Sequence, residues 1–419
     1  MLDIKFIREN SDLVREAARK KHIALDLERL LALDDKRRAL IASVDEMRRI
    51  HKAQSEQTAT LHGSEREVLI RELHGAKDAL SHKEFELRTV ESEFEEAMLA
   101  VPNIPDPSVP EGASDAENQE IKTWGQKSEL PFNPKGHIEL MEKLNMIDLN
   151  RGSKVAGFRG YFLINDGALL SFSIWHYALA FFLKKQFIPM IAPSLVRPEN
   201  LFGTGYLPQG EEDLYKTQDN EYLAGTAEVA TMGYYRDEIL EQSQLPIKFL
   251  SFSPCFRREA GSHGKDVKGL IRVHEFFKLE QVVFCEARHE DSVKFHEWLN
   301  RNTEEFIESL AIPYRTVANC GGDLGLGQVK KYDIELWVPI ENSYREISSA
   351  SYFHDFQTRR LNIKYRDEAG KLRFVHSLNS TAIPTPRILV SLVENFQQPD
   401  GSIRIPKALQ PYMGKEKII

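Results

Sequence analysis

The first 100 residues contain no proline, and this feature constrains the fold more than any other in the 419-residue sequence. Glycine occurs there only at positions 63 and 75, and the strong helix formers Leu, Ala, Glu, Lys and Arg dominate. From Leu69 onward, residues recur in steps of four and three, at Leu69, Leu73, Ala76, Leu80, Lys83, Leu87, Val90, Phe94 and Ala97. This heptad pattern predicts the seam of a coiled coil.

A second apolar stripe precedes this seam and comprises Leu33, Leu40, Val44, Met47 and Leu61. The stripe thins toward His62, Gly63 and Ser64, where glycine and serine favour a reversal of the chain. We therefore expect two long antiparallel helices over residues 27–99, forming a projecting coiled-coil arm. At about 1.5 Å per residue, about thirty residues give each helix a length of about 45 Å.

Four prolines in VPNIPDPSVPEGASD, residues 101–115, end the helical region. We expect a helical domain over residues 1–105, a linker over 106–120 and a second domain over 121–419. In the second domain, IRVHEFFKLEQVVF alternates apolar and polar residues, while ILVSLVENFQ has helical periodicity. The whole chain is thus predicted to be α+β, with the second domain built on a largely antiparallel sheet flanked by helices.

Charge and cysteine content exclude several classes of protein. The net charge of −8 excludes a strongly basic nucleic-acid binder, so any RNA partner needs a local basic patch. Three cysteines without a C-x-x-C pair suggest neither a disulfide framework nor a thiolate zinc site.

The N-terminus lacks a secretory signal, and the apolar stretch 168–183 is short for a membrane span, so a buried core helix is expected. These features predict a cytoplasmic protein without a membrane partner.

Residues 251–280 hold the most informative group of polar side chains. The pattern predicts two strands around a polar loop, with Arg257 and Glu259 on one face of the first strand. On the second strand a period of two places these residues on one face: Arg272, His274, Phe276, Lys278 and Glu280. Such a hairpin could offer cations to a phosphate beside an aromatic ring and carboxylates. A solvated sheet face is the alternative for any single strand.

Several motifs in order resemble those of one enzyme family. FRREAG followed by GLIRVHEFFKLE resembles motif 2 of class II aminoacyl-tRNA synthetases, in the form found in seryl-tRNA synthetases. MLDIKFIRENSDLV is similar to the start of the bacterial enzymes, FIPMIAPSLVRPE resembles motif 1, GTAEVA the serine-binding TxE element, and HSLNSTAIPTPRILVSLVENFQ motif 3. The resemblance implies a class II fold and a serine–tRNA ligase that activates L-serine with ATP. The seryl group would pass from seryl-adenylate to tRNA(Ser), with tRNA(Sec) as a further candidate.

The resemblance also implies roles for residues that bind ATP. Arg257 would bind the α-phosphate and the serine carboxylate, Phe276 would stack on adenine, and Arg387 would bind the γ-phosphate. Arg257, Arg387 and Glu280 are the expected catalytic residues. The full ATP set is Arg257, Arg258, Glu259, Val273, Phe276, Glu346, Ile347, Ser348, Ser349 and Arg387. Thr385 is expected to cap the helix that begins with Pro386 and Arg387.

Glu346 and Ser349 are the Mg²⁺ ligands that the resemblance implies. Residues three apart on a flat strand face opposite sides of the sheet. A bulge or a strand end near Ile347 or Ser348 is therefore expected, because both ligands have to face one metal ion.

Serine binding is expected from a second set, which is Thr226, Ala227, Glu228, Arg257, Glu280 and Thr381. In the family Thr226 and Glu228 would hold the amino group of serine, while Glu280 and Thr381 would receive its hydroxyl. An alanine substrate would then leave Glu280 unpaired, which would reject it.

The tRNA contacts are expected from cations on the arm and in the motif 2 loop, namely Arg37, Arg38, Arg48, Arg49, Lys52, His263 and Lys265. RNA helices are recognised largely through shape and phosphates, so a row of cations suffices. A coiled coil that serves only as a spacer is the alternative. Motif 1 implies a homodimer, and GGDLGLGQ at 321–328 favours a structural turn over a phosphate loop.

Two other functions are alternatives to the ligase. An amino acid:carrier-protein ligase should lack the helical arm, which residues 27–99 supply. A catalytically dead RNA-binding paralogue should have lost Arg257, Glu280 or Arg387, and the sequence contains all three.

Overall fold

The computed structural model describes residues 1–60, 62–261, 264 and 266–419. The chain forms two compact units, of which the first comprises Met1–Arg19 and Ile23–Pro102 and the second comprises Lys20–His22 and Asn103–Ile419. The limits 1–105, 106–120 and 121–419 stay a prediction. The short segment Lys20–His22 belongs to the second unit, and nothing in the sequence pattern predicts this.

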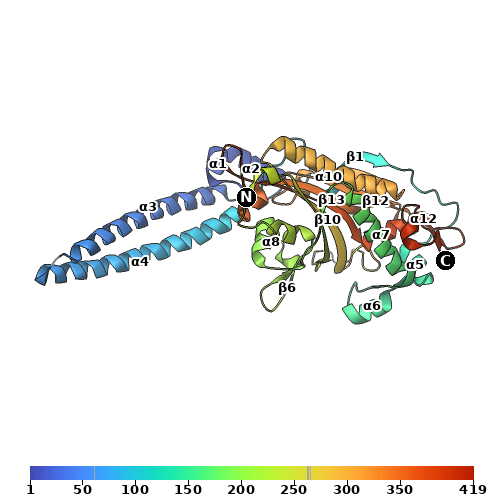
Figure 1. Ribbon diagram of the computed structural model, residues 1–419, viewed down its shortest axis with the longest axis horizontal. Helices are drawn as coiled ribbons and strands as arrows, with labels where there is room; N and C mark the ends of the chain where they lie inside the picture. Colours follow the sequence, from blue (N-terminus) through green and yellow to red (C-terminus); the bar gives the residue numbers. More distant parts are fainter. Residues whose placement is uncertain (61, 262–263, 265) are drawn as a thin grey trace. The chain divides into compact units, whose positions relative to one another are not determined.

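The first unit consists of four helices, which are α1 (Ile4–Glu9), α2 (Ser11–Lys20), α3 (Leu27–Thr58) and α4 (Gly63–Leu99). The long helices α3 and α4 lie side by side and run antiparallel (Figure 1). Leu33, Leu40 and Val90 are buried between them, and Leu87 and Phe94 pack against this cluster. Arg48 and Glu84 form an ion pair of 2.8 Å across the two helices. The predicted coiled-coil arm is confirmed, although Leu61 lies outside the described residues.

An eight-stranded sheet forms the centre of the second unit. Its order is β1-β11-β12-β13-β16-β10-β9-β4, and every neighbouring pair is antiparallel except β4 and β9. Its strands are β1 (Gln119–Trp124), β4 (Ile188–Ile191), β9 (Ile247–Phe256), β10 (Glu275–Cys285), β11 (Tyr314–Ala318), β12 (Lys330–Val338), β13 (Ser343–His354) and β16 (His376–Thr385). The predicted antiparallel sheet is therefore confirmed.

Short strands form four smaller sheets, from β2 (Ile147–Asp148), β3 (Phe162–Leu163), β5 (Leu195–Val196), β6 (Tyr215–Lys216), β7 (Tyr222–Leu223), β8 (Ile239–Glu241), β14 (Lys364–Arg366), β15 (Leu372–Phe374), β17 (Ile403–Arg404) and β18 (Lys417–Ile418). The α-helices of this unit are α5 (His137–Lys143), α6 (Leu149–Ala156), α7 (Asn165–Leu183), α8 (Pro198–Thr204), α9 (Ala227–Gly233), α10 (His289–Ser309), α11 (Phe356–Arg360), α12 (Arg387–Phe396) and α13 (Gln410–Met413).

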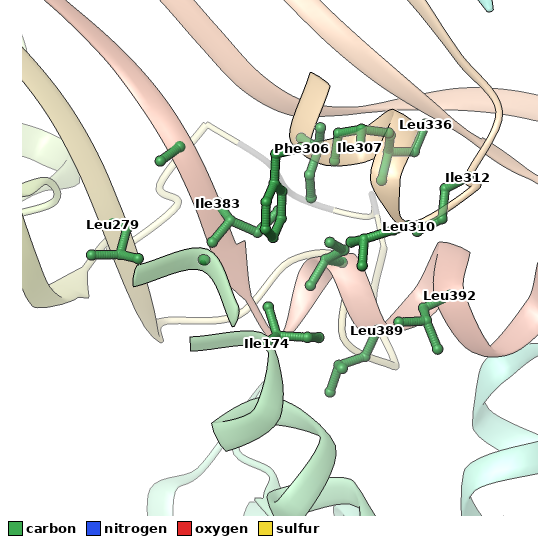
Figure 2. Close-up of a cluster of buried hydrophobic side chains, with 14 of the residues drawn as sticks. Ile174, Leu279, Phe306, Ile307, Leu310, Ile312, Leu336, Ile383, Leu389 and Leu392 are labelled. Carbon is green, nitrogen blue, oxygen red and sulfur yellow. The ribbon is translucent and has the colours of Figure 1, made fainter. Parts of the chain in front are cut away.

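The main core lies between the large sheet and helices α7, α10 and α12. Figure 2 shows Ile174 of α7, Phe306 of α10 and Leu389 of α12 near Leu279 and Ile383 of the sheet, and all five are buried. Burial of large apolar side chains is worth about 1.5–3 kcal/mol for each residue, so this cluster fixes the helices on the sheet. The strands that carry the candidate site are thereby held in register.

The sequence predicts that α7 is a buried core helix, but only one face of the helix is buried. Its length and apolar composition would also suit a membrane span, but Leu170, Ile174 and Phe182 are buried in the core. On its other face Phe172 is 62% exposed, and Leu169, Leu179 and Leu183 are also exposed. One face of the helix therefore packs inside the unit while the other presents an apolar surface.

The predicted strands around residues 251–280 are too long. Strand β9 ends at Phe256, so Arg257 and Glu259 do not share a strand face, and Glu259 turns the chain with φ +55°. Strand β10 begins only at Glu275, so Arg272 and His274 precede it. The residues Leu270, Ile271 and Val273, which also precede β10, are buried.

The helix of motif 3 also begins later than expected. Thr385 is the last residue of β16, Pro386 is the N-cap, and α12 starts at Arg387. The hydroxyl of Thr385 instead accepts a hydrogen bond from Ser171 at 3.2 Å. Arg387 nevertheless lies in the first turn of the helix, as predicted.

Candidate active site

Strands β10, β13 and β16 and the segments beside them line two adjoining cavities. Phe276, Val273 and Arg387 line cavity A. Cavity B has a volume of about 270 Å³ and is lined by Thr226, Glu228 and Glu280, among others. Both cavities share a set of four side chains, which are Arg257, Lys278, Glu346 and Thr381. Cavities A and B therefore form one continuous site with different chemistry at its two ends.

Cavity A combines an aromatic face with cations. The guanidinium carbon of Arg257 lies 5.2 Å from the centre of the Phe276 ring. Arg387 donates from Nε to the carbonyl of Ile271 at 2.8 Å and from Nη1 to the carbonyl of Glu346 at 3.0 Å. Burial lowers the pKa of Arg387, while the charge of Glu346 opposes that shift. A ligand with a flat ring and an attached anionic group would match this aromatic face and its neighbouring cations.

The other residues of the predicted ATP set lie in different surroundings. Val273 and Ile347 are buried and line cavity A. Glu259 also lines cavity A and is ion-paired with Arg272, a residue outside the predicted ATP set. Arg258 is exposed and lines neither cavity, and its backbone N–H donates to the carbonyl of Asp213 at 2.9 Å.

Glu280 is a buried carboxylate that already has two partners. Its Oε2 lies 2.6 Å from Nζ of Lys278 and accepts from the hydroxyl of Thr381 at 3.3 Å. Glu280 and Thr381 face each other because the pairing of β10 with β16 skips Ala382. The expectation that an alanine substrate leaves Glu280 unpaired is therefore wrong, since Lys278 keeps it paired. The period of two along the predicted strand places Lys278 on this face, but the family resemblance assigns no role to it.

Glu228 is a second carboxylate that lines cavity B. Thr226 caps helix α9, and its hydroxyl accepts from the backbone N–H of Glu228 at 3.3 Å. The carboxylate of Glu228 accepts from Gln357 Nε2 at 2.6 Å and from the hydroxyl of Tyr206 at 3.2 Å. Burial raises the pKa of Glu228 to about 7, and the hydrogen bond from Gln357 opposes this shift. Ala227 is buried beside them but does not line the cavity.

Tyr206 and Gln357 were missed by sequence reasoning. Tyr206 precedes the TxE element by twenty residues in a different segment, and no spacing rule links it to Glu228. Gln357 stands in the run YREISSASYFHDFQTRR that also holds Glu346. A buried glutamine has to find hydrogen-bond partners, but sequence alone does not identify them.

Glu346 and Ser349 both line cavity B, as the bulge hypothesis requires. In the pairing of β12 with β13, Ile334 pairs with Ser348 and Glu335 with Glu346, so Ile347 is the bulged residue. The predicted bulge is confirmed. Ser348 points elsewhere, and its hydroxyl donates to the carbonyl of Thr381 at 2.5 Å.

A carboxylate and a hydroxyl are the oxygen donors that a hard cation such as Mg²⁺ prefers. Among the described residues no group of three or more His, Cys, Asp or Glu side chains could hold a metal ion alone. Glu346 and Ser349 therefore fit a cation that takes its remaining ligands from phosphate and water.

The predicted tRNA-binding cations on the arm are engaged in local contacts. Arg37 pairs with Asp34 at 3.0 Å and lies over the ring of Phe94, so it is only partly exposed. Three others pair with carboxylates, which are Arg38 with Asp35 at 2.5 Å, Arg48 with Glu84 at 2.8 Å and Arg49 with Glu46 at 2.7 Å. Lys52 is exposed. His263 and Lys265 lie outside the described residues. The exposed pairs of Arg38 and Arg49 contribute about 0–1 kcal/mol each, so phosphates can compete for these two cations.

Known proteins resemble this chain along its whole length. Residues 1–105 match the seryl-tRNA synthetase N-terminal domain, and residues 213–396 match the tRNA synthetase class II core domain (G, H, P, S and T). The serine–tRNA ligase of Deinococcus radiodurans is 44% identical over 420 residues, covering 100% of this chain and 99% of that ligase.

Two solved structures are also similar. Seryl-tRNA synthetase from Pyrococcus horikoshii complexed with ATP has a TM-score of 0.90 at 37% identity, with 100% of this chain and 99% of that chain covered. The cytoplasmic serine–tRNA ligase of Naegleria fowleri in complex with AMP has a TM-score of 0.87 at 32% identity, with 100% and 98% covered.

Proposed function

The chain belongs to the seryl-tRNA synthetase family and is a serine–tRNA ligase, and from this premise we propose how its residues divide the reaction. ATP binds in cavity A, with adenine on Phe276 and the phosphates toward Arg257 and Arg387. Serine binds in cavity B, with its ammonium group at Thr226 and Glu228 and its hydroxyl toward Glu280 and Thr381. The structural neighbour complexed with ATP supports ATP as the nucleotide substrate.

One observation carries this assignment: Arg257 lines both cavities. The serine carboxylate has to attack the α-phosphorus of ATP, so the two substrates meet at the junction of the cavities. A cation at this junction can bind both anions and stabilise the charge that develops during attack. No activated nucleophilic side chain is needed, because the serine carboxylate is itself the nucleophile.

The phosphates need further positive charge. Arg387 supplies it at the start of α12, and Arg272 lies nearby in contact with Glu259. Glu346 and Ser349 would hold Mg²⁺, which neutralises phosphate charge when bound. The exposed Glu346 side chain lines both cavities, which suits a position between them.

The test of this function is exchange of labelled pyrophosphate into ATP by the purified enzyme without tRNA. We expect exchange that depends on serine and on Mg²⁺, and no exchange with alanine or threonine at equal concentration. Exchange that does not respond to serine would contradict the assignment of cavity B.

Serine activation should depend on the protonation of Glu228. Burial raises the pKa of this carboxyl to about 7, with Glu280 raising it further and Lys278, Gln357 and Tyr206 lowering it. Only the carboxylate attracts the ammonium group of serine, so kcat/KM for serine should rise as the pH increases from 6 to 8. Exchange kinetics across this range measure the effect. Glu228→Gln should remove this rise and increase the KM for serine, whereas an unchanged pH profile in this variant would assign the titration to another group.

Discrimination between serine and alanine should depend on Glu280. Glu280→Gln keeps the side-chain volume but removes the charge that Lys278 and the substrate hydroxyl share. We expect the preference for serine over alanine to fall by about tenfold or more, because a buried group that binds a hydroxyl supplies this scale of discrimination. The ratio of kcat/KM values in the exchange assay measures it. A variant with the wild-type ratio would show that another residue recognises the hydroxyl.

The apolar face of α7 supports a homodimer as the functional state. Ile191 on β4 is 85% exposed within the segment that resembles motif 1, and Phe172 on α7, the helix before this segment, is 62% exposed. Apolar surface of this kind marks a protein interface rather than a solvated face. The dimer is proposed to work in the cytoplasm. Sedimentation that shows a monomer at every concentration would contradict the dimer.

The arm formed by α3 and α4 is proposed to bind tRNA(Ser), with tRNA(Sec) as a second candidate. The N-terminal domain match supports a tRNA-binding role for this region, and Lys52 offers an exposed cation. The arm cations paired with carboxylates would exchange those partners for phosphates, at a cost of about 0–1 kcal/mol for each pair.

A further inference from the structure

A four-residue loop, Gly325–Gln328, forms one wall of cavity B. It follows the short helix Gly321–Asp323 and precedes β12, and no helix or strand includes it. Backbone carbonyls outside helices and strands need other donors when they are buried. The loop contains two glycines, so its backbone has few side chains to restrain it.

Lys21 supplies three of the required hydrogen bonds. Its Nζ donates to the carbonyls of Gly325, Leu326 and Gln328 at 3.1, 2.9 and 2.5 Å. The side chain is buried, with only 3% of the residue exposed, and all three acceptors are neutral carbonyls. Burial lowers the pKa of Lys21 to about 7. A lysine so enclosed cannot reach an RNA phosphate, although in the sequence it stands between the N-terminal helices α2 and α3.

Asn103 holds the same loop from a distant point in the sequence. Its backbone N–H donates to Leu326 at 2.9 Å, and its Nδ2 donates to the carbonyls of Gly327 and Phe353 at 3.0 and 2.8 Å. Together with Lys21 it binds the carbonyls of all four loop residues. Both residues belong to the second unit, and each stands close in sequence to a point where the chain passes to the first.

From these contacts we propose that Lys21 and Asn103 are positioning residues for serine recognition, because they fix the Gly325–Gln328 wall of cavity B. This inference rests on the proposed binding of serine in that cavity. The loop does not line cavity A, so ATP binding does not depend on it in the same way. Lys21 thereby acts on the amino-acid substrate and not on tRNA.

The test compares Lys21→Met with the wild-type enzyme in pyrophosphate exchange without tRNA. We expect the KM for serine to rise about tenfold, which corresponds to a loss of about 1.4 kcal/mol of binding free energy. The KM for ATP should stay within about twofold of the wild-type value. Lys21→Arg should restore most of the serine KM. Lys20→Met is the matched control, because it removes a neighbouring ammonium that lies 4.0 Å from Glu111 and does not bind the loop.

Two measurements separate positioning from a general loss of structure. Hydrogen exchange should accelerate at the amides of residues 325–329 in Lys21→Met, while the amides of β10 and β16 keep their protection. The dissociation constant for tRNA(Ser) should not change. If Lys21→Met does not fold, Asn103→Ala should give the same rise in the serine KM.

Glu228→Gln separates failure of this inference from failure of the proposed function. If Glu228→Gln weakens serine binding while neither Lys21→Met nor Asn103→Ala does, the positioning role is wrong. Equal increases in the KM for serine and for ATP would also overturn it. If Glu228→Gln leaves serine binding unchanged, the placement of serine in cavity B is wrong, and the inference fails with it.

Discussion

Replacing Arg257 with alanine should abolish the first step of the reaction. The guanidinium lies at the junction of cavities A and B, where we propose that the attacking carboxylate and the α-phosphate meet. Loss of one preorganised group that stabilises developing charge reduces rates by about 10²–10³-fold. Arg257 also binds both substrates in the proposed arrangement, so we expect a loss of about 10³-fold or more in serine-dependent pyrophosphate exchange.

The fold should survive this substitution. Within the described residues the Arg257 side chain donates one hydrogen bond, from Nε to the carbonyl of Gly225 at 3.3 Å, and the residue is not part of the apolar core. Arg373→Ala is a matched control, since this exposed arginine pairs with Asp367 at 2.7 Å and lines neither cavity. Thermal unfolding should give similar curves for both variants. A folded Arg257→Ala enzyme with normal exchange activity would refute the role of the cation.

The period of two along β10 predicted the part of the site that depends on simple strand geometry. Phe276, Lys278 and Glu280 do line the cavities, because alternate residues of a strand face the same side. The same rule failed for Arg272 and His274, because β10 begins only at Glu275 and both residues precede the strand. Local spacing therefore located the strand face but not its limits.

Pairing between distant segments could not be predicted from the sequence. The contact of Glu280 with Thr381 depends on the skipped Ala382 in β16, and sequence periodicity does not show which residue a partner strand omits. Gln357 and Tyr206 reach Glu228 only because α11, α8 and α9 come together in the fold. No sequence pattern links Lys21 to residues 325–328, yet three of their carbonyls accept hydrogen bonds from its Nζ, and these loop residues line cavity B.

The pair formed by Lys278 and Glu280 changes the account of amino-acid specificity. A carboxylate without a partner would make an alanine substrate costly, but Lys278 satisfies Glu280 whether or not a hydroxyl is present. If the serine hydroxyl binds at Glu280 as proposed, selectivity depends on how much stronger the interaction of ammonium, carboxylate and hydroxyl is than that of the Lys278–Glu280 pair alone. Charge-assisted hydrogen bonds contribute about 1.5–3 kcal/mol, which suffices for at least tenfold discrimination.

Shortening the arm should separate the two steps of the reaction. Residues 47–85 can be replaced by about four glycines, since packed helices lie about 8–10 Å apart and an extended residue spans about 3.5 Å. This change keeps Leu33, Leu40 and Val90, which form the buried cluster of α3 and α4. Pyrophosphate exchange should stay near the wild-type rate, because every proposed ATP and serine contact lies between Tyr206 and Arg387.

Transfer of serine to tRNA should instead fall by about a hundredfold in the shortened enzyme, because the proposed phosphate contacts of the arm are lost. The net charge of −8 leaves no general attraction to replace them. Binding of tRNA(Ser) by the intact enzyme should weaken as salt rises, and the shortened form should show a shallower dependence. Lys52→Ala in the full-length enzyme is the single-residue comparison, expected to reduce the salt slope by about one. If the shortened enzyme charges tRNA at the wild-type rate with the same salt dependence, the arm is a spacer and its proposed contacts with RNA do not exist.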